Sequence, residues 1–220
     1  NMINTTGTLN VLMTAKKQKV RKVVYASSSS VYGIAQYMPI DEKHPLNPIS
    51  IYGASKLAAE KYCQVFNEVL DVPMVILRYH TVYGPRQRPD MAIYKWTKLL
   101  LDGKPPIIYG DGDQSRDFTY ISDIINGTIS AAETNNVRGE IFNIGSGIRT
   151  SVKETVRLLI KLIGKDGLKP IYESPKQGDV PDTWADISKA KKLLLYNPKV
   201  ALEDGLQHFI AWWTSHSQLS

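Results

Sequence analysis

The stretch KVVYASSSS, residues 22–30, is the clearest guide to the fold. Its first part, Lys22 to Ala26, has the short apolar character of a buried strand, and four serines follow it. The preceding segment, Thr8 to Lys17, carries apolar residues at helical spacing. A helix that leads into a buried strand is typical of a parallel sheet with crossover helices.

The rest of the chain repeats this alternation. Apolar spacing predicts a helix over Ser55 to Val69, and the β-rich run Val72 to Tyr79 predicts a second buried strand. Later helices are predicted over Ala92 to Leu101, Ile121 to Glu133, Val152 to Ile163 and Leu202 to Trp213, and later strands up to Tyr109 and over Ile141 to Ile144. We therefore expect an α/β fold, with a domain boundary near residues 85–90, where the pattern changes.

Composition narrows the class of protein. The chain has 220 residues, a net charge of +6 and one cysteine, Cys63, which cannot form an internal disulfide and is expected in the core. The lysines are scattered in pairs along predicted helices, which favours solvated faces over a nucleic-acid-binding patch. No apolar run reaches the roughly 18 residues of a membrane span, and the first residues lack the apolar core of a signal peptide. A cytoplasmic protein is expected.

A tyrosine and a lysine four residues apart could form a catalytic pair, because positions i and i+4 share one face of a helix. The chain has three such pairs: Tyr52 with Lys56, Tyr94 with Lys98, and Tyr172 with Lys176. Pro175 disfavours a helix in the third pair, and the second lies in an apolar helix where packing is the expected role. The first pair opens a helix after the serine run, near a strand end of the kind that binds ligands in parallel sheets.

Tyr52 is therefore the candidate general base. An unperturbed phenol titrates near pH 10 or so, and a neighbouring ammonium, here that of Lys56, favours the phenolate and makes it usable near neutral pH. A hydroxyl from the serine run could bridge the phenol and a substrate hydroxyl, because it both donates and accepts hydrogen bonds. The alternative for the serine run is a polar loop.

Five segments, in this order, resemble the extended short-chain dehydrogenase/reductase family, the NAD-dependent epimerases and dehydratases of nucleotide sugars. They are Tyr25 to Gly33 (YASSSSVYG), Tyr52 to Lys56 (YGASK), Leu77 to Pro85 (LRYHTVYGP), Arg116 to Tyr120 (RDFTY) and Thr183 to Lys189 (TWADISK). The resemblance implies that Ser28, Tyr52 and Lys56 are catalytic and that NAD is the cofactor. It also implies that Asn4, Tyr52, Lys56 and the backbone of Tyr79 lie at the nicotinamide end of the site. The alternative for Asn4 is a helix N-cap.

The resemblance also implies an architecture. Residues 1–88 would be the C-terminal part of a Rossmann-type parallel-sheet domain, and residues 89–220 mainly a smaller α/β substrate-binding domain, with segments that could return to the Rossmann sheet. In the family a Gly-rich turn after the first strand holds the cofactor pyrophosphate, and residues 1–30 do not contain such a turn. Gly145 to Thr150 is similar to it but lacks a third glycine, and Ser151 with Glu154 predicts a helix capping box there instead.

Two interpretations of the chain follow. In the first, it is the larger part of a full-length enzyme. In the second, it is a truncated and catalytically inactive product that binds nucleotide sugars or dimerises.

The residues after Ser28 indicate the reaction. Dehydratases of this family carry an Asp-Glu pair where this chain has Ser29 and Ser30, so an epimerase is favoured. The resemblance implies that Tyr52 takes the proton of the C4 hydroxyl while hydride leaves C4 for NAD, which gives a 4-keto sugar, and that hydride then returns to the other face. Because NAD is regenerated in each cycle, it should be held tightly.

Several positions resemble UDP-glucuronate 4-epimerases more than the UDP-glucose enzymes. They are Thr81, the stretch Val82 to Ala92 and the stretch Gly178 to Asp186. Ser29, Ser30, Thr81 and Arg88 could bind a uronate carboxylate through hydroxyls and a guanidinium. A UDP-glucose 4-epimerase is the alternative function. Separately, the alternative for Arg88 is a surface residue in a turn.

For the UDP part, Arg116 matches the family's diphosphate-binding arginine. Lys176 stands where relatives often have arginine, Asp179 is suited to hydroxyl contacts, and the backbone around Tyr109 would hold the uracil. No metal site and no membrane or nucleic-acid partner is predicted. The helices at residues 8–17 and 52–69 correspond to the pair through which relatives dimerise, so a homodimer is expected.

Two residues depart from the family pattern. His80 stands where relatives usually have an aromatic residue, and it is expected to substitute for that shape, with a catalytic role as the alternative. Leu195 stands where a glycine commonly ends a helix. Because a left-handed cap disfavours leucine, a different helix ending is expected.

Overall fold

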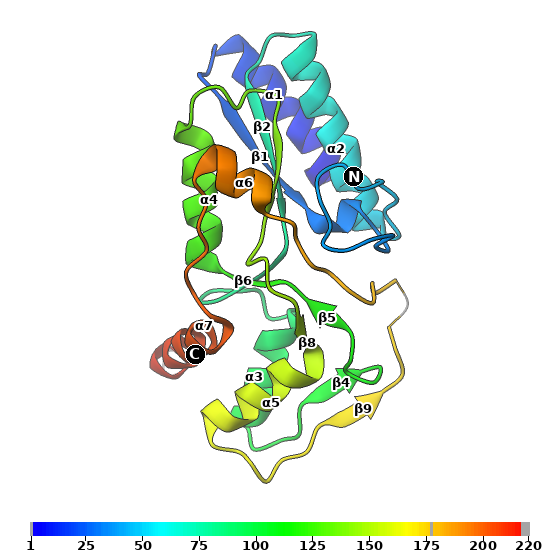
Figure 1. Ribbon diagram of the computed structural model, residues 1–220, viewed down its shortest axis with the longest axis vertical. Helices are drawn as coiled ribbons and strands as arrows, with labels where there is room; N and C mark the ends of the chain where they lie inside the picture. Colours follow the sequence, from blue (N-terminus) through cyan, green and yellow to red (C-terminus); the bar gives the residue numbers. More distant parts are fainter. Residues whose placement is uncertain (1, 177, 217–220) are drawn as a thin grey trace.

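The computed structural model describes residues 2–176 and 178–216 (Figure 1). Its largest sheet is parallel, with the strand order β1-β2-β7. The strands are β1 (Val23–Ser28), β2 (Met74–Tyr79) and β7 (Ile141–Ile144). The register aligns Ser28 with Tyr79 and Tyr79 with Ile144, so the carboxyl ends of all three strands lie at one edge of the sheet.

Helices cover both faces of this sheet (Figure 1). A π-helix (Met2–Gly7) leads into α1 (Thr8–Lys17), which packs with α2 (Ile51–Glu68) on one face, while α4 (Ile121–Glu133) and α6 (Ser188–Leu194) pack on the other. Each face has its own apolar core, because successive side chains of β2 point to opposite faces. The core on the α1–α2 face includes Leu12, Cys63, Phe66, Met74 and Ile76, and the opposite core includes Val75, Leu77, Ile124, Phe142 and Ile144.

The second part of the molecule lies beyond the carboxyl edge of the sheet (Figure 1). Three helices, α3 (Ala92–Leu101), α5 (Val152–Ile163) and α7 (Leu202–His216), share a third core that includes Trp96, Leu100, Val156, Leu159 and Phe209. Short strands pair around it: β3 (Thr81–Tyr83) with β6 (Phe118–Tyr120), β4 (Ile107–Tyr109) with β9 (Ile171–Glu173), and β5 (Ser115–Arg116) with β8 (Thr150–Ser151).

The predicted α/β fold is confirmed, and α1, α3, α4, α5 and β7 have the predicted bounds. The helix α2 begins earlier than predicted, because the Ser50 side chain accepts a hydrogen bond of 3.0 Å from the Gly53 amide and caps it. Cys63 is buried, as expected. The domain division at residue 88 stays a prediction; β7, from the second half of the chain, pairs within the main sheet.

The end of α6 differs from the expectation. Leu195 adopts the left-handed conformation with φ 54°, so the prediction of another helix ending was wrong. The Leu195 side chain is exposed, while the next residue, Tyr196, is buried and its hydroxyl donates to the Gly145 carbonyl oxygen at 2.9 Å. Anchoring of Tyr196 therefore sets the backbone at Leu195. Across residues 2–176 and 178–216, every helix is too short or too polar to cross a bilayer.

Candidate active site

A cavity of about 360 Å³ opens at the carboxyl edge of the sheet. It is lined by the serine run at the end of β1, by Tyr52 of α2, by the residues that follow β2 and by Arg88. The register explains this convergence, because Ser28 and Tyr79 are aligned at the ends of neighbouring parallel strands. Strand order and helix capping thus bring predicted site residues from three segments to one cavity.

Tyr52 and Lys56 lie together on α2. The Tyr52 side chain is 48% exposed, and the Lys56 ammonium is 5.9 Å from the centre of its ring. Lys56 Nζ donates to the Ala26 carbonyl oxygen at 2.8 Å and also lies over the Tyr25 ring. Burial lowers the pKa of Lys56. The ammonium is therefore held close to the phenol ring by a backbone contact to β1.

The four serines do not form a loop. Ser27 and Ser28 end β1, and Ser29 begins a single 3₁₀ turn that is capped by the Ser28 side chain, which accepts from the Ser30 amide at 3.2 Å. The Ser28 hydroxyl also lies 3.1 Å from the Ser30 hydroxyl. The bridging role of Ser28 stays a prediction, but its hydroxyl is fixed at the cavity.

Asn4 does not cap α1, since the residue before that helix is Gly7 and no side chain caps it. The side-chain amide of Asn4 donates instead to the hydroxyl of Ser55 at 3.0 Å. Ser55 directly precedes Lys56 in the chain. The Tyr79 hydroxyl is hydrogen-bonded to Thr128 of α4 at 2.8 Å. This contact directs the Tyr79 ring toward α4, and the cofactor role of its backbone stays a prediction.

A second, larger cavity of about 590 Å³ lies in the other part of the molecule. Its walls are largely apolar and include Trp96, Leu99, Ile107, Phe118 and Val152. Four predicted nucleotide-binding residues, Tyr109, Arg116, Lys176 and Asp179, line the same cavity. The Lys176 ammonium is 3.9 Å from the centre of the Tyr109 ring, a cation–π contact that positions both.

A smaller cavity of about 170 Å³ is adjacent to both, because it shares lining residues with each. Thr81 lines all three cavities. Arg116 forms an ion pair of 2.6 Å with Asp179 there and donates to the Pro181 carbonyl oxygen at 3.1 Å. Arg88 stands at the rim of the first cavity, 76% exposed and paired with Asp90 at 3.3 Å. Among the predicted site residues, all of which lie in the described ranges, Asn4 and Lys56 line none of these three cavities, and the others each line at least one.

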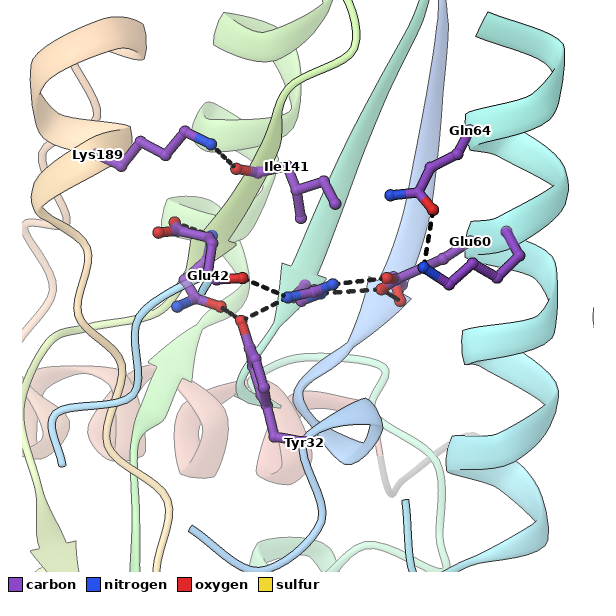
Figure 2. A network of polar contacts seen from close by, with 10 residues as sticks. Tyr32, Glu42, Glu60, Gln64, Ile141 and Lys189 are labelled. Carbon is purple, nitrogen blue, oxygen red and sulfur yellow. Dashed lines mark hydrogen bonds and ion pairs between the residues drawn. The ribbon is translucent and has the colours of Figure 1, made fainter. Parts of the chain in front are cut away.

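The sequence prediction missed the buried polar groups behind the site. Arg78 and Glu60 form a fully buried ion pair between β2 and α2, surrounded by further polar side chains (Figure 2). Asp117, next to Arg116, is buried and accepts hydrogen bonds from the Ser146, Gly147 and Ala185 amides. A charged residue inside the apolar run Val72 to Tyr79 was the available signal for the first of these.

The residues present fit the nicotinamide end of NAD. The half-exposed Tyr52 and the serine hydroxyls line one cavity, and the Lys56 ammonium lies 5.9 Å from the centre of the Tyr52 ring, so a phenol, hydroxyls and an ammonium are available to contact a nicotinamide ribose. The described residues contain no cluster of three or more metal-ligating side chains. A parallel sheet with this tyrosine, lysine and serine at the carboxyl ends of its strands is typical of the Rossmann class of dinucleotide-binding proteins.

The chain belongs to the NAD dependent epimerase/dehydratase family, whose sequence profile matches residues 1–145. It is 45% identical over 206 residues to a Bacillus subtilis protein named an uncharacterized UDP-glucose epimerase, which covers 93% of this chain and 64% of that protein. The UDP-glucuronate 4-epimerase of Thermodesulfobacterium geofontis is 41% identical over 98% of this chain and 66% of its own.

The fold matches a solved enzyme. It superposes on the UDP-glucuronic acid 4-epimerase of Bacillus cereus, crystallised with UDP-glucuronic acid and NAD, with a TM-score of 0.92 and 43% identity, over 96% of this chain and 67% of that one. The chain thus spans about two thirds of the length of these relatives. The relatives divide between UDP-glucuronate and UDP-glucose enzymes.

Proposed function

We propose that this chain is the catalytic and sugar-binding part of an NAD-dependent 4-epimerase that interconverts UDP-glucuronate and UDP-galacturonate. The observation that carries the proposal is the adjacency of the cavities: the serine–tyrosine cavity and the Arg116 cavity lie next to each other and share the lining residue Thr81. A nucleotide sugar needs this arrangement, with its sugar at the chemistry and its diphosphate and base further along.

In this mechanism Tyr52 takes the proton of the sugar C4 hydroxyl and later returns it, which is general acid–base catalysis. Lys56, held beside the ring by the Ala26 carbonyl, stabilises the negative charge on the phenol oxygen. Ser28 holds the C4 hydroxyl by donating and accepting in turn. NAD would be held at its nicotinamide end by Lys56 and the backbone of Tyr79, and when bound it would supply the hydride acceptor and donor that exchange at C4 requires.

The UDP part lies in the larger cavity in this proposal. Arg116 offers its guanidinium to the diphosphate, because a planar fork matches phosphate oxygens. Asp179 now pairs with that guanidinium at 2.6 Å and would release it to the ligand. The apolar wall around Trp96 and the Tyr109–Lys176 pair suit a planar base.

The uronate specificity rests on the hydroxyls of Ser29, Ser30 and Thr81, which line one cavity together with Arg88. Hydroxyl donors and a guanidinium can hold a carboxylate. The second candidate, a UDP-glucose 4-epimerase, is favoured by a different observation: Arg88 is mostly exposed and already paired with Asp90, as in a surface turn. A neutral hydroxymethyl group would not need it.

The test compares UDP-glucuronate and UDP-glucose side by side with the intact protein and NAD, with the products separated by chromatography. Preferred turnover of UDP-glucuronate is expected. Equal or faster turnover of UDP-glucose would establish the second candidate. If neither sugar turns over while UDP-glucuronate still binds in calorimetry, the interpretation as an inactive binding fragment stands.

A homodimer through α1 and α2 belongs to the same proposal. Apolar side chains on both helices are exposed: Val11, Met13, Val65 and Val69. Burial of such groups against a second copy would be favourable. Light scattering at micromolar concentration should give the mass of two chains, and a monomer would contradict the proposal.

A further inference from the structure

A network of buried polar side chains lies between the sheet and α2, next to the candidate site (Figure 2). At its centre Arg78 of β2 makes two hydrogen bonds to Glu60 of α2, from Nε at 3.0 Å and from Nη2 at 2.8 Å. Both side chains are 2% exposed. The other arm of the guanidinium, Nη1, donates to the Tyr32 hydroxyl at 3.1 Å and to the Glu42 carbonyl oxygen at 3.2 Å.

Each member of this pair is a close neighbour of a site residue. Glu60 follows Lys56 by four residues and shares a helix face with it. Arg78 directly precedes Tyr79 in β2. Glu60 also accepts a hydrogen bond from the hydroxyl of Ser27, the residue before Ser28. The Glu60 carboxylate therefore links α2 by hydrogen bonds to β1 and to β2, the two strands that carry predicted site residues.

The network continues across the main sheet to β7. The Tyr32 hydroxyl donates to Asn143 of β7 at 2.7 Å. The Asn143 amide group in turn donates to the carbonyl oxygens of Ile40 at 2.9 Å and of Asp186 at 3.3 Å. The segment at Asp186 follows the stretch that carries Lys176 and Asp179. The polar chain thus extends from α2 to the strand connections behind the cavities.

Stability alone does not account for this pair. The cost of removing two charges from water often cancels their attraction, and apolar side chains of similar size can replace such a pair with little change in stability. A two-pronged arginine–carboxylate contact, however, fixes both distance and orientation. Catalysis demands such precision, since a misplacement of about 1 Å can reduce a rate by roughly 100-fold.

We propose that Glu60 and Arg78 are positioning residues, whose ion pair sets Tyr52 and Lys56 of α2 against Ser28 of β1. They touch neither substrate nor cofactor themselves. The inference rests on the proposed function for its effect on turnover, while the seating of α2 against the sheet can be measured independently of any reaction.

The experiment uses the intact protein with the paired substitution Glu60→Met and Arg78→Met, which removes both charges at similar volume, and the milder Arg78→Lys, which keeps the charge but loses the fork. Cys63 reports on α2, because it lies one turn after Glu60, is fully buried, and burial raises its pKa to about 12. The matched control is Arg138→Met, which removes an exposed arginine that contacts Asn67 at the other end of α2.

In the paired variant we expect a urea midpoint close to that of the wild type. A thiol reagent should label Cys63 at least tenfold faster than in the wild type. The kcat should be reduced at least tenfold, with an unchanged KM for the UDP-sugar. Arg78→Lys should reduce kcat by a smaller factor, and Arg138→Met should change neither readout. The proposal would be overturned if the paired variant or Arg78→Lys had the same rate of Cys63 labelling and the same kcat as the wild type. Should the wild type itself turn over no UDP-sugar, the proposed function fails, and the labelling rates alone decide on the positioning role.

Discussion

The site at the sheet edge and the larger cavity are built in different ways. At the sheet edge, Tyr52 and Lys56 stand on a regular helix, and the ion pair behind them, Arg78 with Glu60, is 2% exposed at both side chains. In the larger cavity, Arg116 and Asp179 come from a two-residue strand and a loop, and their side chains are 13% and 51% exposed.

This difference teaches which groups can move. A buried, two-pronged pair cannot open without leaving a charge unpaired in the interior, so the elements that it joins, β2 and α2, keep one arrangement. A pair with a half-exposed carboxylate can exchange its partner for a ligand at little cost, because water screens the released charge. Chemistry would then use the rigid region and ligand binding the adaptable one.

The largest expected effect tests the rigid region directly. Tyr52→Phe should lower kcat by about 10²- to 10⁴-fold, because general acid–base catalysis contributes a factor of that size. Steady-state turnover of UDP-glucuronate measures it. The matched control is Tyr94→Phe, which alters a tyrosine with the same lysine spacing whose ring packs on Trp213 and Phe209. Retained activity in Tyr52→Phe would remove the mechanism.

The next effect concerns stability. Arg78→Met alone should lower the free energy of unfolding by about 3–5 kcal/mol, because it leaves Glu60 buried and unpaired. Arg138→Met, which breaks the exposed pair with Asp71, should cost only about 0–1 kcal/mol. Urea unfolding of the two variants compares them. If Arg78→Met and Arg138→Met lost similar amounts of unfolding free energy, the buried and the exposed ion pair would not differ as proposed.

Ligand binding tests the adaptable region. Arg116→Ala should weaken UDP binding by roughly 10- to 100-fold, the equivalent of about 1.5–3 kcal/mol for hydrogen bonds to a charged group. Calorimetry with UDP gives the Kd. Arg149→Ala serves as control, since Arg149 also pairs with an aspartate, Asp182 at 3.0 Å, but lines none of the three cavities. An unchanged Kd in Arg116→Ala would exclude this arginine as the diphosphate ligand.

The smallest effect comes from His80, between the two regions. It is buried beside Asp117 and Asn143, and neither ring nitrogen makes a well-formed hydrogen bond to the described residues. Burial lowers the pKa of His80, so below about pH 6.5 the unfolded chain binds a proton that the folded chain does not. The free energy of unfolding therefore decreases as the pH is lowered, by up to about 1.4 kcal/mol per pH unit.

His80→Phe should remove this slope, as expected if the imidazole substitutes for an aromatic shape. Unfolding free energies at pH 5.5 and 7.5 measure it, with His208→Phe as the control at an exposed position. A slope that is the same in His80→Phe and the wild type would contradict the assignment.

Local patterns predicted most of the fold. The bounds of α1, α3, α4 and α5 follow from apolar spacing, because a helix registers its buried face within a few residues. The left-handed Leu195 could not be predicted, since a distant contact of Tyr196 imposes it. The site divides in the same way: the Tyr52–Lys56 pair is a matter of helical spacing, whereas Arg116 meets Asp179 across 63 positions of the chain.

The sequence by itself determined most of the long helices, the strands β1, β2, β4 and β7, and the tyrosine–lysine pair, because each depends on residues within one or two helical turns. Only the tertiary structure decided that Glu60 pairs with Arg78, that Tyr32 reaches Asn143 across 111 positions, and that three cavities share their walls. Those contacts depend on how parallel strands align and on which face of each helix meets the sheet. Local spacing carries no information about either.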